Sequence, residues 1–448
     1  MGKVYVVHCV DTEGPLNESL SATFDRIKEV SGIELEPSMD TLSKIQNKEI
    51  ALDGKEDMLA EVFSKRILAY NRDMGELDKM LDKITSSEFR GKYKDSYGHG
   101  WKYTWFIMDH VDYDTNPRGR MIGYHVIWDH YQEYYRMKHI DDDEFQLHIH
   151  PASIYREANR CGTSYLNSPH ALKSIAHRLI DRGFFANSYR AGVHTERPDS
   201  HWLLEQYIPY DYSNQSIQLT ECEMKQLDLS AGRFGDWRRA PADWSWYHPS
   251  HDDYQVPGHC RRVIFRCLNI GTRLRVITQK EVDKAFKRAQ DGIDTVLAFC
   301  DHDFRNMSYD VEEAYQYIIE AKKKYPDVDW INTTASAAAK IVLDEKQTPF
   351  DLKVKCMETD GRVRVDISSN IDSFGPQPFF AVKTKGGDYR VENLDVQKPN
   401  RAWSFVFDDD SIHPNDIVSI GIASNSQEGS GALLVFNLDN EQLFNRIW

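Results

Sequence analysis

The chain has 448 residues, too many for one ordinary domain and enough to bury a large hydrophobic core. It carries 55 lysine and arginine residues against 70 acidic ones, and the net charge of −15 argues against nonspecific binding of nucleic acid or of a membrane surface. Seven scattered cysteines without a Cys-x-x-Cys pair, no signal sequence and no long apolar run predict a cytoplasmic protein that does not insert into a membrane.

The first predicted strand, over residues 3–10, is apolar and leads directly into two carboxylates. Asp11 and Glu13 are two positions apart, so on an extended chain their side chains point the same way. Carboxylates at the carboxyl end of a parallel strand are typical of α/β enzymes, whose sites lie at that edge. The alternative is a solvated turn that Gly14-Pro15 terminates.

Residues 16–100 form a long insertion after this strand. Apolar positions recur at helical spacing over residues 58–69 and 77–81. Because the insertion leaves from the strand end that carries the two carboxylates, it is predicted to form a helical cap near the site. A surface decoration is the alternative.

A histidine pair marks the strand predicted over residues 144–150. His148 and His150 stand at i and i+2, which places both imidazoles on one face of a strand, and Pro151 ends the run. Neutral imidazole nitrogens are common ligands of divalent metals such as zinc. The pattern therefore predicts a pair of metal ligands.

Arginines are concentrated between Gly232 and Val276. This stretch holds eight arginines, four aspartates and no lysine or glutamate. Arginine suits bidentate contacts to phosphate, which would favour a carbohydrate substrate linked to a nucleotide or to a lipid diphosphate. Tryptophans and tyrosines in the same stretch offer faces on which sugars stack. The alternative is that the arginines pair with acidic residues elsewhere in the chain.

His302 follows the apolar strand predicted over residues 294–301. It stands between Asp301 and Asp303, whose negative charge is expected to orient the imidazole and to raise its pKa. A histidine of this kind is a candidate general acid. The two flanking acids could equally be solvated loop residues.

The whole pattern predicts an α/β fold with a second, all-β domain. Strand-like runs alternate with helical patterns, which favours a parallel sheet or barrel; these runs cover residues 3–10, 101–108, 144–150, 184–190, 205–213, 294–301 and 328–333. From Phe350 onward, short runs alternate at period two between turn residues, which predicts a β-sandwich. We therefore expect one domain over residues 1–345 and another over 350–448.

Taken in chain order, the motifs resemble those of the polysaccharide deacetylase family, carbohydrate esterase family 4. The segments similar to its five motifs are Val10–Gly14, the run ending in His150-Pro151, Ser188–Gly192, Asp243-Trp244 and Leu297–His302. The resemblance covers residues 3 to about 340. It implies a distorted (β/α) barrel with fewer than eight strands.

The resemblance also implies a role for each site residue. Asp11 is the general base, Arg190 orients it, His302 is the general acid, and Asp243 completes the catalytic set; Glu13, His148 and His150 hold a divalent metal ion, with zinc expected. Two positions depart from the family pattern. Gln146 stands where a histidine is usual, and Glu13 replaces the commoner aspartate.

The implied function is metal-dependent removal of an N-acyl group, usually acetyl, from an amino sugar that is a precursor in surface polysaccharide biosynthesis. Two alternatives stay open: an amidohydrolase that acts on a non-sugar amide, and a catalytically silent relative that binds carbohydrate. The reason for the second alternative is Gln146, which stands where a histidine is usual. The C-terminal sandwich could bind sugar or form an interface in an oligomer.

Overall fold

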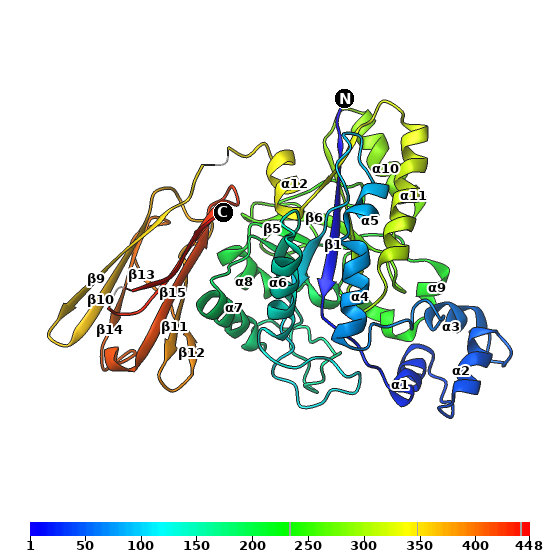
Figure 1. The fold of residues 1–448 in the computed structure, drawn as a ribbon, viewed down its shortest axis with the longest axis horizontal. Coiled ribbons are helices and arrows are strands. Elements are labelled where there is room, and N and C mark those ends of the chain that lie inside the picture. The colour runs from blue at the N-terminus through cyan, green and yellow to red at the C-terminus, as the bar shows by residue number, and fades with distance from the viewer. Residues whose placement is uncertain (233, 347, 440) are drawn as a thin grey trace.

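The computed structural model describes residues 1–448 except Arg233, Gln347 and Asn440. An α/β barrel occupies the chain as far as about residue 343, and antiparallel sheets formed by residues from 352 onward lie beside it (Figure 1). The polar residues predicted to form a site lie on the barrel part.

Seven parallel strands close the barrel. In ring order they are β1 (Val4–Thr12), β2 (Thr104–Ile107), β3 (Glu144–Ile149), β4 (Ser188–Ala191), β5 (Tyr210–Asn214), β6 (Val263–Asn269) and β7 (Thr295–His302). The carboxyl half of β1 pairs with β2, whereas its amino half pairs with β8 (Trp330–Thr333), which lies outside the ring. The predicted distorted barrel with fewer than eight strands is confirmed.

Strand alternation divides the residues of β1 between two apolar clusters. Val4, Val6 and Val10 pack with the surrounding helices, whereas Tyr5 and Cys9 pack in the barrel interior. Both faces of the strand are buried, as is usual in parallel sheets, so β1 reads as a continuous apolar run. Residues at odd-numbered positions of β1 therefore point inward.

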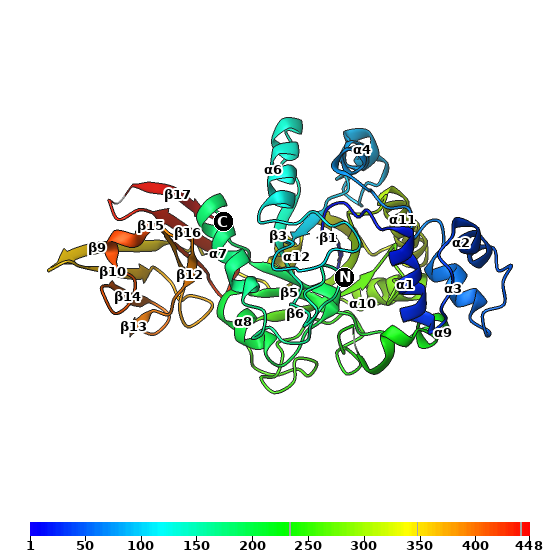
Figure 2. The same ribbon diagram turned by 90° about the horizontal axis from the view of Figure 1, so that it is seen from below.

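Helices surround the ring of strands (Figure 2). They are α4 (Met74–Ile84), α5 (Ser87–Lys92), α6 (Val126–Lys138), α7 (His170–Arg182), α8 (Ser200–Tyr207), α9 (Glu221–Met224), α10 (Gln279–Gln290), α11 (Ser308–Lys324) and α12 (Ala335–Val342). Most are amphipathic and bury one apolar stripe against the strands. No helix within the described ranges combines the length and the apolar character that crossing a membrane requires.

The insertion after β1 has two parts. Helices α1 (Leu20–Ser31), α2 (Met39–Gln46) and α3 (Glu56–Val62) share a small core of their own, whereas α4 and α5 pack into the main core of the barrel. Helix α1 begins soon after the carboxyl end of β1 (Figure 1). Its Arg26 lines the cleft described below, so this part of the insertion lies beside the candidate site.

The C-terminal part is a β-sandwich, as predicted. One sheet has the order β13-β14-β10-β9 and the other β12-β11-β15-β16-β17. The strands are β9 (Leu352–Thr359), β10 (Arg362–Ser369), β11 (Phe379–Thr384), β12 (Tyr389–Val391), β13 (Asp395–Lys398), β14 (Ala402–Phe407), β15 (Ile417–Asn425), β16 (Gly431–Phe436) and β17 (Gln442–Ile447). Alternate residues such as Phe380 and Val382 fill the core between the two sheets.

The five-stranded sheet also packs on the barrel. Phe379 and Ala381 of β11 point away from the sandwich core and pack with residues of α7 and α8. A polar contact adds to this interface: Asp181 of α7 accepts hydrogen bonds from Lys383 Nζ at 2.9 Å and from Tyr389 Oη at 2.6 Å. The central strands β15 and β16 are therefore buried almost throughout, which fixes the sandwich against the barrel.

Candidate metal and acid-base site

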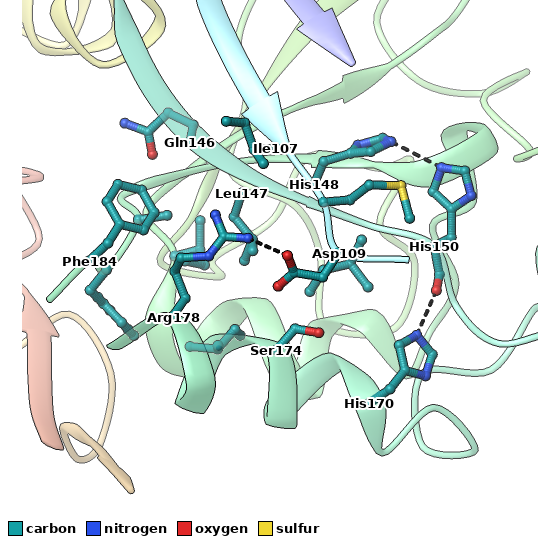
Figure 3. A pocket seen from close by; sticks show the side chains of 16 residues that line it. Ile107, Asp109, Gln146, Leu147, His148, His150, His170, Ser174, Arg178 and Phe184 are labelled. Carbon is teal, nitrogen blue, oxygen red and sulfur yellow. Dashed lines mark hydrogen bonds and ion pairs between the residues drawn. The ribbon is translucent and has the colours of Figure 1, made fainter. Parts of the chain in front are cut away.

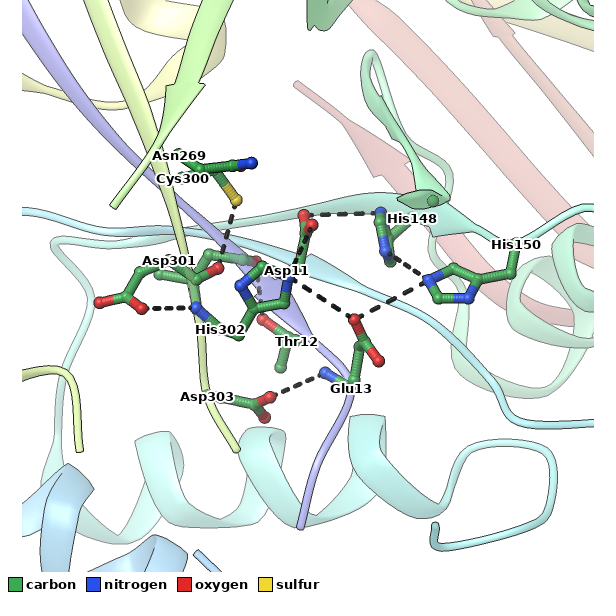
Figure 4. Close-up of polar contacts among 12 residues, drawn as sticks. Asp11, Thr12, Glu13, His148, His150, Asn269, Cys300, Asp301, His302 and Asp303 are labelled. Atoms are coloured by element: carbon green, nitrogen blue, oxygen red, sulfur yellow. Dashed lines mark hydrogen bonds and ion pairs between the residues drawn. The ribbon is translucent and has the colours of Figure 1, made fainter. Parts of the chain in front are cut away.

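Inward-facing positions at the carboxyl ends of the strands bring most of the predicted site residues together (Figure 4). Asp11 of β1 continues the inward row of Tyr5 and Cys9, and the register of the sheet pairs it with His302 of β7. In the same way, His148 of β3 is the register partner of Arg190 of β4. The barrel therefore places four of these side chains at one end of its interior.

Asp11 lies at the centre of the site. Arg190 Nη1 donates a hydrogen bond to its Oδ2, and His302 Nε2 lies 3.6 Å from the same oxygen. His148 Nδ1 lies 3.6 Å from the other oxygen, Oδ1. Burial alone would favour the neutral acid, but the positive charge of Arg190 outweighs it and keeps the pKa of Asp11 below its usual value. Asp11 is therefore an ionised carboxylate at neutral pH.

Arg190 is wholly buried and is held by two residues that the motifs did not identify. Its Nη2 lies 3.0 Å from His194 Nδ1 and 3.3 Å from Asn269 Oδ1. Asn269 ends the apolar strand β6, which is the same signal that identified Asp11, so the sequence could have indicated it. His194 lies in the loop after β4, where no pattern singles it out.

Glu13 is oriented by an arginine that the sequence did not indicate. Arg120, from the loop between β2 and α6, places Nη2 2.5 Å from Glu13 Oε2. The other oxygen, Oε1, faces His150 Nε2 at 3.8 Å and His302 Nε2 at 4.0 Å. Burial opposes ionisation of Glu13, but the charge of Arg120 holds its pKa well below the usual range. The carboxylate is thus fixed with one oxygen turned toward the histidines.

The loop that carries Glu13 is tied to β7 by Asp303. The Asp303 carboxylate accepts hydrogen bonds from the backbone N–H groups of Glu13 at 2.9 Å and Gly14 at 2.9 Å, and from Tyr131 Oη at 2.9 Å. Gly14 has a φ of +68°, and a Cβ there would lie 2.1 Å from Ile127 Cδ1. The positive φ favours glycine at this position, and any larger residue would also require the Ile127 side chain to move.

His148 and His150 face each other with the geometry that a shared ion requires. Their Nε2 atoms are 3.1 Å apart, and His148 Nδ1 donates to the backbone oxygen of Arg190 at 2.8 Å. Two imidazole nitrogens on one tetrahedral zinc lie about 3.3 Å apart, given Zn–N distances of roughly 2.0–2.1 Å. The hydrogen bond at Nδ1 leaves the Nε2 lone pair of His148 free to act as a ligand.

Two overlapping groups of side chains could hold a divalent ion here. One is Glu13, His148 and His150, and the other is Asp11, Glu13 and His302, with the ligand atoms of each group within 4.8 Å of one another. The first group offers two imidazoles and one carboxylate, a donor set that catalytic zinc sites use. It also leaves Asp11 and His302 free for proton transfer, so it is the better fit.

The flanking acids do not act on His302 as expected. Asp301 points to the opposite face of the strand, where its Oδ1 accepts the backbone N–H of His302 at 2.7 Å and its Oδ2 lies 3.9 Å from His8 Nε2. Asp303 binds the β1 loop. Burial lowers the pKa of His302 to about 3, against the influence of Asp11 and Glu13. The prediction of a raised pKa is wrong because alternation along β7 turns both neighbours away from the imidazole.

Asp243 is not part of this site, which corrects its assignment to the catalytic set. Its side chain is 67% exposed, bonds to Ser245 and lies 3.6 Å from Arg288 of α10. Trp244 beside it is buried, with Nε1 donating to the backbone oxygen of Glu281 at 2.8 Å. This segment packs against the outer helices, and Asn269 and His194 contact Arg190 instead.

The arginines between residues 232 and 276 mostly serve the structure. Ion pairs to acidic residues take up five of them: Arg238, Arg239, Arg262, Arg266 and Arg273. Arg275 donates to two backbone oxygens, and Arg233 lies outside the described residues. Of the aromatic residues in the stretch, those that are buried cannot offer a face to a sugar: Trp237, Trp244, Tyr247 and Tyr254. The pairing alternative therefore accounts for this stretch.

Gln146 has a structural role. Its Oε1 accepts the backbone N–H groups of Asn187 and Ser188 at 3.2 and 2.9 Å, and its Nε2 donates to Asn187 Oδ1 at 2.8 Å. These contacts tie β3 to the start of β4. His148, one inward step further along the strand, lies 3.6 Å from Asp11 Oδ1, so Gln146 does not leave a gap among the candidate ligands.

Two cavities adjoin the histidine pair, and their sizes differ greatly. An enclosed gap of about 20 Å³ lies between β3 and α7, behind His148 and His150 and beside the buried Arg178–Asp109 ion pair (Figure 3). It has room for about one water molecule. The second is an open cleft of about 300 Å³ that Asp11, Glu13 and His302 line. The side chains of Asp11, Glu13 and His302 are therefore accessible from this cleft.

No protein-family model, curated protein or solved structure matches this chain. The chemistry of the site must therefore be argued from its own residues. They offer an ionised carboxylate, a neutral imidazole beside it, and a carboxylate and two imidazoles that fit a divalent ion, at the end of a barrel where a cleft opens.

Proposed function

We propose that this protein is a metal-dependent hydrolase that removes an N-acyl group, acetyl in the simplest case, from an amino sugar used as a precursor of a surface polysaccharide. The observation that supports this most is the position of Asp11. It is ionised by Arg190, adjoins the donor set of Glu13, His148 and His150, and lies 3.6 Å from His302. Metal-assisted hydrolysis of an amide uses each of these groups.

Metal binding and proton removal fall to different side chains of the site. A divalent ion on Glu13, His148 and His150 would lower the pKa of a water molecule and polarise the acyl carbonyl. Asp11 takes the proton of the attacking water, because Arg190 keeps it ionised and aimed into the cleft. The products are a short carboxylic acid and a free amine.

The leaving nitrogen needs a proton, since an amide anion departs poorly. His302 is neutral in this site, and its Nε2 lies 3.6 Å from Asp11 Oδ2. His302 therefore accepts the proton that Asp11 has collected and passes it to the nitrogen as the C–N bond breaks. One proton moves from water through the two side chains to the amine, and the site returns to its starting charge.

A non-sugar amide is the second candidate substrate. Of the five aromatic side chains on which a sugar was expected to stack, Trp246 is exposed and the others are buried: Trp237, Trp244, Tyr247 and Tyr254. This observation favours an amide bound by polar and charged groups in the cleft. The silent alternative loses its support, because Gln146 is engaged between β3 and β4 and the donor set is complete without it.

Metal content and acetate release test this function together. We expect purified protein to hold about one zinc or similar ion per chain and to release acetate from N-acetylglucosamine oligomers. The His148→Ala, His150→Ala double variant should lose both, whereas Asp11→Asn should keep the ion and lose the activity. Asp243→Asn, an exposed carboxylate on the outer surface, is the matched control and should keep both. Wild-type metal content in the double variant, or full activity in Asp11→Asn, would contradict the proposal.

A further inference from the structure

Three arginines from distant parts of the chain converge beside Tyr70, at one wall of the cleft. Arg26 of α1 and Arg118 of the loop before α6 each direct Nη2 at Tyr70 Oη, at 3.1 and 3.4 Å. Arg305, just after β7, places its guanidinium 5.8 Å from the centre of the same ring. All three arginines line the cleft that also contains Asp11 and His302.

Glu18 is the carboxylate that pairs with two of these arginines. Glu18 is buried and binds Arg26 through both oxygens, at 2.8 and 2.9 Å, while Arg118 Nε lies 2.6 Å from its Oε1. Arg305 has no carboxylate within 4.0 Å in the described part of the chain, and of its five N–H donors only Nε has a partner there, the backbone oxygen of Ile67 at 3.0 Å. Two guanidinium groups thus share the negative charge of Glu18, and the third, that of Arg305, has no carboxylate partner among the described residues.

Nearby acids do not correct this imbalance, because they are already paired. Asp228 binds Arg273, and Asp310 binds Arg66. Burial, together with the charge of Arg26, lowers the pKa of Arg118 to about 10, which reflects the cost of holding the two cations side by side. Arg305 is the member of the group without a counter-ion, and its Nη1 is buried with no hydrogen-bond partner among the described residues. A buried charge of this kind is expensive for a protein, so the arrangement implies a binding partner rather than a purely structural role.

Arg26, Arg118 and Arg305 are here called the Tyr70 arginines. They lie in the same cleft as the proposed reacting groups, Asp11 and His302. Phe304 connects the two regions: its ring lies 4.9 Å from that of His302 on one side and carries Arg305 at 4.6 Å. Arg120, the anchor of Glu13, lies over the same ring at 4.5 Å. A molecule whose reacting bond lies at Asp11 therefore has the Tyr70 arginines within the same cleft.

We infer that the substrate carries an oxyanion, a phosphate or a carboxylate, which the Tyr70 arginines bind while the acyl group lies at Asp11. Guanidinium groups bind such anions through paired N–H donors, and the unused donors of Arg118 and Arg305 are available for this. The cleft is thus cationic on this wall within a chain of net charge −15, so an anionic substrate is drawn to this part of the surface. The inference rests on the proposed function for the position of the acyl group but not for the anion site.

Binding of inorganic phosphate and of glucuronate, measured by calorimetry without any turnover, tests the anion site. Wild-type protein should bind at least one of the two, and which of them binds more tightly distinguishes a phosphate from a carboxylate source. Arg305→Gln and Arg118→Gln should each weaken binding roughly 10- to 100-fold, as expected for loss of a charge-assisted contact. Arg239→Gln, which removes a surface ion pair with Asp253, is the matched control and should bind like the wild type.

A second measurement needs no variant. Whichever of the two anions binds should raise the melting temperature of the wild-type protein above that in chloride of equal ionic strength, because a ligand of the folded state stabilises it. Failure of both anions to bind, or unchanged binding by folded Arg305→Gln and Arg118→Gln proteins, would overturn the inference. Neither outcome depends on hydrolysis: a protein that binds phosphate through these arginines but releases no acetate would refute the proposed function alone.

Discussion

Replacement of Arg190 by glutamine probes the pair on which the site depends. The side chain of Arg190 is wholly buried and that of Asp11 is 2% exposed, so the variant leaves a carboxylate in the interior without its counter-charge. Loss of one member of a buried ion pair costs about 3–5 kcal/mol. We expect Arg190→Gln to lose an amount of this order in free energy of unfolding at pH 7, measured by urea denaturation.

The loss should depend on pH in a definite direction. In the wild type the pKa of Asp11 is depressed, so the pair stabilises the fold above the unfolded pKa of about 3.9, and this contribution is lost as the pH falls through the folded value. In Arg190→Gln burial dominates and should raise the pKa of Asp11 above about 3.9. The deficit of the variant relative to the wild type should therefore be largest near pH 8 and should shrink toward pH 5.

A second substitution isolates the cause. Asp11→Asn removes the unpaired charge, so the Asp11→Asn, Arg190→Gln double variant should be more stable at pH 7 than Arg190→Gln alone. The matched control is Arg178→Gln, which breaks the buried pair with Asp109 elsewhere in the barrel and should not be rescued by Asp11→Asn. A deficit that does not change with pH, together with no rescue by Asp11→Asn, would refute the electrostatic account of this pair.

Three further predictions address proton transfer, the turn and the domain interface. His302→Ala should lose most activity on an N-acetyl sugar but keep a larger fraction on an activated aryl acetate, because an ester leaving group needs less protonation; equal losses would give His302 a positioning role. Gly14→Ala should lower the melting temperature and the metal content together, since alanine is strained at a φ of +68° and its Cβ would displace the Ile127 side chain. Normal values for both would contradict this account of the turn. Hydrogen bonds from the surrounding side chains hold the pKa of Asp181 well below its usual value despite its burial. Asp181→Asn should therefore destabilise the protein at pH 7 and progressively less toward pH 3. A loss of free energy of unfolding that stays constant with pH would rule out an ionised Asp181 in its contact with Lys383.

Much of the fold follows from local patterns in the sequence. The alternation of apolar strands with helical patterns predicted the barrel, and the period-two runs after residue 350 predicted the sandwich, because burial of one face is imposed on each element separately. The same reasoning identified Asp11 and Glu13, and His148 and His150, as residues sharing a face at a strand end. In the structure these four side chains lie together.

Contacts between segments that are far apart in the sequence could not be predicted from local patterns, because they form only when the barrel closes. Nothing local indicates that Arg120 binds Glu13, or that His194 and Asn269 hold Arg190, since each pair joins loops or strands far apart in the sequence. The arginines between residues 232 and 276 are mostly paired with acidic residues, whereas the Tyr70 arginines of the cleft come from three other segments.

The direction of a charged side chain also depended on the tertiary structure. Asp301 and Asp303 flank His302 in the sequence. In the structure, strand alternation turns Asp301 toward the outer helices, and Asp303 accepts hydrogen bonds from the loop after β1. Burial of the imidazole then sets its pKa, and burial is a property of everything packed around a group. The sequence determined which residues stand at the strand ends; only the packed barrel decided which of them are charged, which are paired and which face the cleft.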